Sequence, residues 1–303
     1  GFRDSLKDLQ SKAQQAMNGG GTPPPIPWSS KPGSSSPSPS SAPATPYWQP
    51  HCHPSSPVST NFHHEQGNWG WGNNESQNYV DDTQNSFHTP DGCLVVHAII
   101  NHNHPDPNRK FTSARLSSHQ PLSRNKGSLS ARITAPSAPG IWPAFWLLPK
   151  DPFTWPYDGE MDIMEAWNGE KTNHTCMHWG HFNGEDHDKH RVVETPIPAI
   201  DSKHGVRYDF AWDEDEHTGQ GKLVWYIDGR PVMKANKPQG TRPMRDFRIL
   251  INIAVGGNVC QGVMPKDGTY EFVIRELAMW DAPPGGWARF EHDWKNTREG
   301  HGM

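Results

Sequence analysis

Three carboxylates lie within six residues of this 303-residue sequence, in the segment EMDIME that begins at Glu160. The rest of the segment is apolar, which favours a strand, and in a strand residues i and i+2 point to the same face. Glu160 and Asp162 therefore share a face, whereas Glu165 would point to the other one. One additional residue near Ile163 and Met164, forming a β-bulge, would return Glu165 to the face of the other two acids.

Three acids on one face of an apolar strand indicate catalysis, because like charges held together raise the pKa of at least one of them. Two carboxyls in different protonation states are what glycoside hydrolysis requires. In retaining glycosidases these carboxyls lie about 5–5.5 Å apart, one as nucleophile and one as acid and base. The Cα atoms of Glu160 and Glu165 would lie about 13 Å apart, so both side chains must lean inward on a concave sheet. A solvated outer strand face is the alternative interpretation.

The composition supports a carbohydrate site and excludes several other classes of protein. The chain has 14 Trp residues, and indole rings stack well on sugar rings. A formal charge of −5 excludes a strongly basic nucleic-acid binder, and no apolar stretch is long enough for a transmembrane helix. The carboxylate segment is flanked by several of the Trp residues, namely Trp142, Trp146, Trp155, Trp167 and Trp179.

The elements that must position these residues are short strands. Between residues 58 and 283, apolar or alternating runs recur between turn signals such as Asp91-Gly92 and Asp228-Gly229, which predicts a β-sandwich or barrel. Residues 284–303 are expected to form a polar C-terminal tail, although Trp287, Phe290 and Trp294 could pack back on the domain.

The N-terminal part of the chain has a different composition. Residues 1–19 have apolar side chains at helical spacing, which predicts a short amphipathic helix, and residues 20–57 are rich in Pro, Ser and Gly, as in a disordered linker. A plain spacer is one interpretation of this arm. A weak membrane-surface contact or an SH3-type contact through residues 1–57 is the other.

The four cysteines, Cys52, Cys93, Cys176 and Cys260, are widely spaced and form no CxxC motif. This excludes a zinc ribbon or a thioredoxin-type site, and it leaves one or two disulfides open. Five histidines lie between residues 174 and 190, and we expect a wet loop over the cleft rather than a metal site. His174 and His178 would lie about 13 Å apart on a strand.

Several segments in addition to the acidic one resemble glycoside hydrolase family 16, in its laminarinase-like form with the bulged Glu-x-Asp-x-x-Glu signature. They occur in the order of the family and cover roughly residues 60–282. These segments are WGNNE at 71–75, TSAR at 112–115, AR at 131–132, GIWPAFWLLP at 140–149, WYIDG at 225–229 and NIAVGGN at 252–258.

The resemblance implies a β-jelly roll, a concanavalin A-like all-β sandwich of two curved antiparallel sheets with the substrate cleft on the concave face. It implies Glu160 as nucleophile, Asp162 as assisting residue and Glu165 as general acid and base, with net retention. It also implies substrate-binding roles for four residues, which are Trp142, Trp155, His178 and Asn73.

Two departures from the family pattern affect binding. Val259-Cys260 stands where the family often has a cleft Trp, which puts one sugar subsite in question. Arg275 stands where many members have a calcium-binding Asp, so we predict that this calcium site is absent. We expect no metal and no cofactor.

The resulting prediction is a monomeric, retaining endo-β-glucan hydrolase acting on β-1,3 or mixed β-1,3(1,4) linkages of a polysaccharide. The alternatives are a transglycosylase on cell-wall glucan, a non-catalytic carbohydrate-binding module, and a scaffold protein acting through its Pro-rich arm. Residues 1–19 show no apolar signal segment, which favours a cytoplasmic or membrane-peripheral location. The substrate leaves an extracellular or cell-wall location open.

Overall fold

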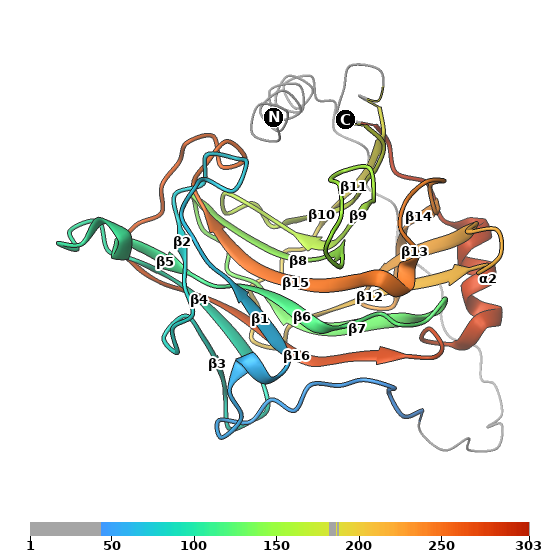
Figure 1. The fold of residues 1–303 in the computed structure, drawn as a ribbon, viewed down its shortest axis with the longest axis horizontal. Helices are drawn as coiled ribbons and strands as arrows, with labels where there is room; N and C mark the ends of the chain where they lie inside the picture. The colour runs from blue at the N-terminus through green and yellow to red at the C-terminus, as the bar shows by residue number, and fades with distance from the viewer. Residues whose placement is uncertain (1–43, 182–185, 187, 303) are drawn as a thin grey trace.

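The computed structural model describes residues 44–181, 186 and 188–302, and within them two curved β-sheets pack face to face (Figure 1). The predicted all-β sandwich is therefore confirmed. One sheet has seven strands in the order β1-β6-β15-β8-β9-β10-β11. These strands are β1 (Phe62–Glu65), β6 (Arg115–Pro121), β15 (Phe247–Val255), β8 (Ile141–Pro149), β9 (Glu160–Glu165), β10 (Thr172–His178) and β11 (His190–Pro196).

The second sheet has the order β14-β13-β12-β7-β16-β4-β5-β2, and β3 also pairs with β4. Its pairs are antiparallel except that β2 and β5 run parallel. Its strands are β14 (Arg230–Asn236), β13 (Gly221–Ile227), β12 (Val206–Glu214), β7 (Lys126–Thr134), β16 (Gly268–Trp280), β4 (Leu94–Ile100), β5 (Phe111–Ser113), β2 (Asn78–Tyr79) and β3 (Ser86–His88).

Alternating side chains explain how the sheets pack. In β12, Tyr208, Phe210 and Trp212 are fully buried in the large core between the sheets, because every second residue of a strand points the same way. Ala211 points to the outer face and belongs to a separate small cluster. The core is thus filled by one face of each sheet, which leaves the other face of the seven-stranded sheet for chemistry.

The C-terminal segment differs from the expected polar tail. Residues Gly286–Asn296 form the helix α2, which lies beside β13 in Figure 1. Phe290 is fully buried against Ala211 and Tyr226, and Trp287 and Trp294 pack on the same cluster. Packing of these aromatic residues on the domain was the alternative that the sequence left open, and the apolar contact stabilises a helix too short to be stable alone.

The start of the packed domain also differs from the boundary expected at residue 58. Tyr47 donates its hydroxyl to the carbonyl of Leu122 at 2.5 Å, and Trp48 forms a β-bridge with Met279. The side chain of Tyr47 and the backbone of Trp48 thus attach the end of the Pro-rich segment to the sandwich. The predicted helix over 1–19 and the linker up to residue 43 lie outside the described residues. Among the described residues, no helix is long and apolar enough to cross a membrane.

Candidate active site

The three carboxylates lie on β9, which carries the bulge that the sequence predicted. Phe145 of β8 pairs with Met164, and the next residue of β8, Trp146, pairs with Asp162. Ile163 is therefore the additional residue, and both it and Met164 point into the core. Because of this extra residue, Glu165 returns to the face of Glu160 and Asp162.

The neighbouring strand β10 places two more side chains opposite the acids. His178 pairs with Glu160 and Cys176 with Asp162 in the antiparallel register. The Nε2 atom of His178 lies 3.8 Å from Glu160 Oε1, 3.7 Å from Asp162 Oδ2 and 3.2 Å from Cys176 Sγ. His178 is thus in the position that the family resemblance indicated, between the first two acids.

Each of the two glutamates accepts a hydrogen bond from an indole. Trp155 donates its Nε1–H to Glu160 Oε2 at 2.7 Å, and Trp142 donates to Glu165 Oε1 at 2.7 Å. The backbone of Glu165 is held as well, because its N–H donates to Asn173 Oδ1 at 3.0 Å. Both Trp residues were predicted as substrate contacts, and the structure adds that they orient the carboxylates.

Burial raises the pKa of all three acids. The pKa of Glu160 rises to about 7, mainly through burial, against the hydrogen bond from Trp155 and the charge of Arg115. The pKa of Glu165 rises to about 8 through burial and the charge of Glu160. The pKa of Asp162 rises well above its usual value through burial and the charges of both glutamates. The three acids therefore cannot all ionise together near neutral pH.

His178 does not supply a compensating positive charge. Its burial, together with neighbouring His190, lowers its pKa to about 3. The imidazole is therefore neutral at the pH where the acids titrate.

Asn73 is connected to the acids of β9 through Glu75. Its Nδ2 donates to Glu75 Oε1 at 2.9 Å, and Gln77 Nε2 donates to Glu75 Oε2 at 2.6 Å. Burial raises the pKa of Glu75 to about 7, and its charge in turn contributes to the raised pKa of Glu165. The sequence interpretation did not include Glu75 in the site, although the WGNNE segment contains it.

Arg115 is a second residue of the site that sequence reasoning did not assign. Its guanidinium lies 4.8 Å from the ring centroids of both Trp71 and Trp146, and its Nε donates to Glu65 at 2.8 Å. Its charge lowers the pKa of Glu160. The TSAR segment was the signal that could have identified it.

The histidine-rich stretch is more ordered than the wet loop expected from its polarity. His174 and His190 are buried in β10 and β11, and His174 stacks on Trp167 with ring centroids 3.8 Å apart. Strand pairing explains the difference, because it places His178 and His190 opposite each other on the face of the sheet that carries the acids, where His174 also lies. Residues 182–185 and 187 of this stretch lie outside the described residues.

The remaining departures concern cysteines and Arg275. All four cysteines are free thiols. Cys260 is fully buried, so it does not replace the cleft Trp as a sugar contact. Arg275 donates to Thr134 Oγ1 at 3.0 Å, and absence of the calcium site stays a prediction.

Comparisons with known proteins agree with this geometry. A family model described as "XgeA-like, catalytic GH16 domain" matches residues 77–196. Glucan endo-1,3-β-glucosidase A1 of Niallia circulans is 31% identical over 226 residues, which are 68% of this chain and 32% of that protein. The β-glucanase of Rhodothermus marinus is 29% identical over 239 residues, 72% of this chain and 78% of that protein. The chain thus spans about a third of the first relative's length.

Solved structures give the same result. The catalytic domain of a laminarinase from Thermotoga petrophila RKU-1 matches with a TM-score of 0.59 and 27% identity, over 73% of this chain and 90% of that one. An endo-1,3-β-glucanase from Streptomyces sioyaensis shares the fold with a TM-score of 0.65 at 22% identity, over 81% of this chain and 98% of that one. The chain is thus similar to the catalytic domains of glycoside hydrolase family 16, and to laminarinases among them.

Proposed function

We propose that this protein is a retaining endo-β-glucan hydrolase that cleaves β-1,3 or mixed β-1,3(1,4) glucosidic bonds by double displacement. The observation that carries the proposal is the bulge at Ile163, which brings Glu160 and Glu165 to one face of a single strand. Each of the two is held by its own indole donor.

In the first step, Glu160 attacks the anomeric carbon and forms a glycosyl ester, while Glu165 gives its proton to the leaving glycosidic oxygen. The pKa directions support this assignment. Glu165 holds its proton more tightly than Glu160 does, and Glu160 is nearer to the charge of Arg115 that favours its anionic form.

In the second step, the carboxylate of Glu165 removes a proton from water, which attacks the anomeric carbon and releases Glu160. Two inversions give net retention. Asp162 assists by remaining protonated beside Glu160, which avoids a second negative charge next to the nucleophile. Neutral His178 limits the freedom of both side chains.

The glucan substrate is inferred from similarity and from the aromatic lining. Relatives are named for β-1,3-glucan or for 1,3-1,4-glycan cleavage, such as the endo-1,3-1,4-β-glycanase ExsH of Rhizobium meliloti. Trp71 and Trp146 flank Arg115 near the acids, and flat rings beside a cation suit a hydroxyl-rich sugar.

The test is to incubate the full chain with laminarin, lichenan and agarose and to separate the products by size. We expect a ladder of oligosaccharides from laminarin or lichenan, lost in Glu160→Gln. The matched control is Glu271→Gln, an exposed glutamate of β16 in the other sheet, which should keep the ladder. Binding of laminarin without products by the unmodified chain would instead indicate a binding module, and products longer than the substrate would indicate a transglycosylase.

A further inference from the structure

Beside the proposed nucleophile, four side chains from two strands form a compact square. Glu160 and Asp162 of β9 face His178 and Cys176 of β10 as directly opposed antiparallel pairs, and such pairs hold their Cβ atoms about 5 Å apart. One atom each from Asp162, Cys176 and His178 lies within 4.8 Å of the other two. The glycosidase chemistry proposed above gives no role to the thiol of this square.

The distances within the square fit a tetrahedral cation. Sulfur–zinc bonds of about 2.3 Å and nitrogen– or oxygen–zinc bonds of about 2.0–2.1 Å place neighbouring ligand atoms roughly 3.4–3.6 Å apart. His178 Nε2 lies 3.2 Å from Cys176 Sγ and 3.7 Å from Asp162 Oδ2. Glu160 Oε1, at 3.8 Å from the same nitrogen, can occupy the fourth position. The three distances from His178 Nε2 thus lie within a few tenths of an ångström of the spacing in a zinc site.

The square also lacks what a cation would supply. The side chain of Asp162 is 6% exposed, and its Oδ2 has no hydrogen-bond partner among the described residues. The imidazole nitrogen beside it is a common metal ligand. Two carboxyls and a thiol therefore meet in a buried place, and among the described residues neither Glu160 nor Asp162 forms an ion pair with Lys or Arg.

We propose that Asp162, Cys176 and His178 form a binding site for a thiophilic divalent cation of the zinc and cadmium class, and that its occupancy inhibits the enzyme. Binding forms a metal–thiolate and a metal–carboxylate bond, and the protons of the Cys176 thiol and of the Asp162 carboxyl both go to solvent. Magnesium and calcium bind poorly here, because they prefer six or more oxygen ligands.

Inhibition follows from where the cation lies. A cation on Asp162 and His178, with Glu160 as fourth ligand, withdraws the nucleophile's electron pair and blocks its approach to the anomeric carbon. The site is accessible from solvent on the face where the substrate is proposed to bind, since 18% of the His178 side chain and 13% of the Glu160 side chain are exposed. Substrate and cation should therefore compete.

The direct test is spectroscopic and uses no sugar substrate. We would titrate the metal-free full chain with Cd²⁺ and record the thiolate-to-cadmium charge-transfer absorption. We expect one equivalent to bind, Zn²⁺ to displace it, and Cys176→Ala to lose the signal. The matched control is Cys52→Ala, because Cys52 is the most exposed of the four thiols and should not contribute.

A second variant covers the case in which Cys176→Ala does not fold. His178→Ala keeps the thiol and should weaken cadmium binding by at least about tenfold, since even outer-shell partners of metal ligands cost that much. A signal that survives in Cys176→Ala, or an affinity unchanged in His178→Ala, overturns the proposal.

Activity provides the functional arm of the test. Zn²⁺ should inhibit laminarin cleavage, chelator should restore it, and Mg²⁺ should have no effect. Cadmium binding at Cys176 in a chain that cleaves no glucan would contradict the proposed function and uphold the cation site. Zinc inhibition that persists equally in Cys176→Ala, relative to that variant's own zinc-free rate, would overturn the cation site and leave the proposed function standing.

Discussion

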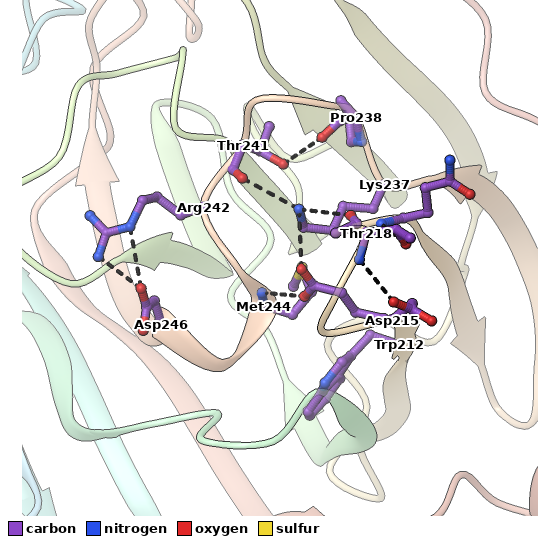
Figure 2. A network of polar contacts seen from close by, with 12 residues as sticks. Trp212, Asp215, Thr218, Lys237, Pro238, Thr241, Arg242, Met244 and Asp246 are labelled. Carbon is purple, nitrogen blue, oxygen red and sulfur yellow. Dashed lines mark hydrogen bonds and ion pairs between the residues drawn. The ribbon is translucent and has the colours of Figure 1, made fainter.

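Buried carboxylates occur in two regions of this molecule with opposite surroundings. At the end of β12, Glu214 Oε1 lies 3.3 Å from Lys237 Nζ, and the two side chains are 4% and 3% exposed. Glu214 Oε2 also accepts the backbone N–H of Met244 at 2.7 Å, and Lys237 donates to the carbonyl of Thr241 at 3.3 Å (Figure 2). This acid has a cation and a hydrogen-bond donor, as a buried charge requires.

The acids of β9 have hydrogen-bond donors in Trp155 and Trp142, but they have no such cation. Among the residues that the structure describes, neither Lys nor Arg forms an ion pair with Glu160, Asp162 or Glu165, and the imidazole of His178 lies within 4 Å of the first two. Burial alone therefore does not identify a catalytic acid. A structural acid is neutralised locally, whereas the β9 acids are left to raise one another's pKa.

The two regions are also connected. Figure 2 shows Arg242 and Asp246 near Met244, whose backbone N–H donates to Glu214. Arg242 Nη1 donates to the carbonyl of Pro152 at 3.0 Å, and its backbone N–H donates to Asp158 at 3.0 Å. These bonds hold both ends of the loop that carries Trp155. The structural region therefore supports the donor that orients Glu160.

Replacement of the buried glutamate by glutamine, made once in each region, should give the largest difference in kcat and Tm between the two. Glu160→Gln should lower kcat on laminarin by at least about 10⁴-fold, because the nucleophile is lost. Its Tm should stay equal or rise, since the amide retains an acceptor for Trp155 and removes a desolvated acid. Glu214→Gln should lower the Tm, and its kcat, measured at temperatures below the new Tm, should stay unchanged. Equal kcat losses in both variants would abolish the distinction.

Replacement of Glu165, the proposed general acid and base, should have the next largest effect. Glu165→Gln should lower kcat by roughly 10²–10⁴-fold. On an aryl glucan-oligosaccharide whose leaving group needs no proton, kcat/KM should fall little, because it reports the first step, whereas kcat should still fall, because the second step needs Glu165 as base. In the unmodified chain Glu165 must be protonated and Glu160 ionised, so activity should fall above pH about 8 and below pH about 7. The two pH values at which activity falls are properties of the coupled Glu160–Glu165 pair rather than of either residue alone.

The pH profile of Glu165→Gln on the aryl substrate provides the check. Its alkaline limb should disappear, because the group that loses the proton is gone. An alkaline limb that is unchanged would show that another group supplies the proton.

Removal of the Lys237 ammonium group, the cation beside Glu214, should lower the stability of the fold. Lys237→Met leaves Glu214 buried and unpaired, which should lower the free energy of unfolding by about 3–5 kcal/mol. The double variant Glu214→Gln/Lys237→Met should recover part of this loss, because the amide still accepts from Met244. Chemical denaturation of the three proteins checks the prediction. A double variant less stable than Lys237→Met would contradict it.

The smallest effect concerns the indole donor. Trp155→Phe removes the hydrogen bond to Glu160, which normally lowers the pKa of that carboxyl. The acidic limb of the pH profile should therefore move to higher pH, and kcat should fall on the order of tenfold or more, the value of a hydrogen bond to a charged group. Trp179→Phe, an indole outside the two donor bonds, serves as the control. A pH profile that does not shift in Trp155→Phe would show that this indole does not affect the pKa of Glu160.

The acidic strand was the part of the molecule most open to prediction from sequence. In EMDIME the spacing of polar and apolar residues allows one arrangement that buries Met161, Ile163 and Met164 and still groups the acids, and it requires the observed bulge. The strand class of the domain followed from the same alternation. His178 was found by resemblance, and its contact with Asp162 depends on a register that no local pattern specifies.

Other features depend on long-range packing and could not be predicted in the same way. Glu75 approaches Glu165 only because segments about 90 positions apart meet across the fold. Lys237 meets Glu214 through a loop between β14 and β15, and a lone Lys in a polar stretch gives no sign of burial. The helix α2 was missed because it is stabilised by Tyr226 and Ala211 of the sheet rather than by its own sequence.

The most direct test of the central claim, that Glu160 and Glu165 work from one face as nucleophile and acid, is the anomeric configuration of the first product. Proton NMR during the first minutes of laminarin hydrolysis distinguishes the two anomers before they equilibrate. We expect the β-anomer to appear first and Glu160→Gln to yield neither anomer. Initial release of the α-anomer would require a water between the two carboxyls and would exclude Glu160 as a nucleophile.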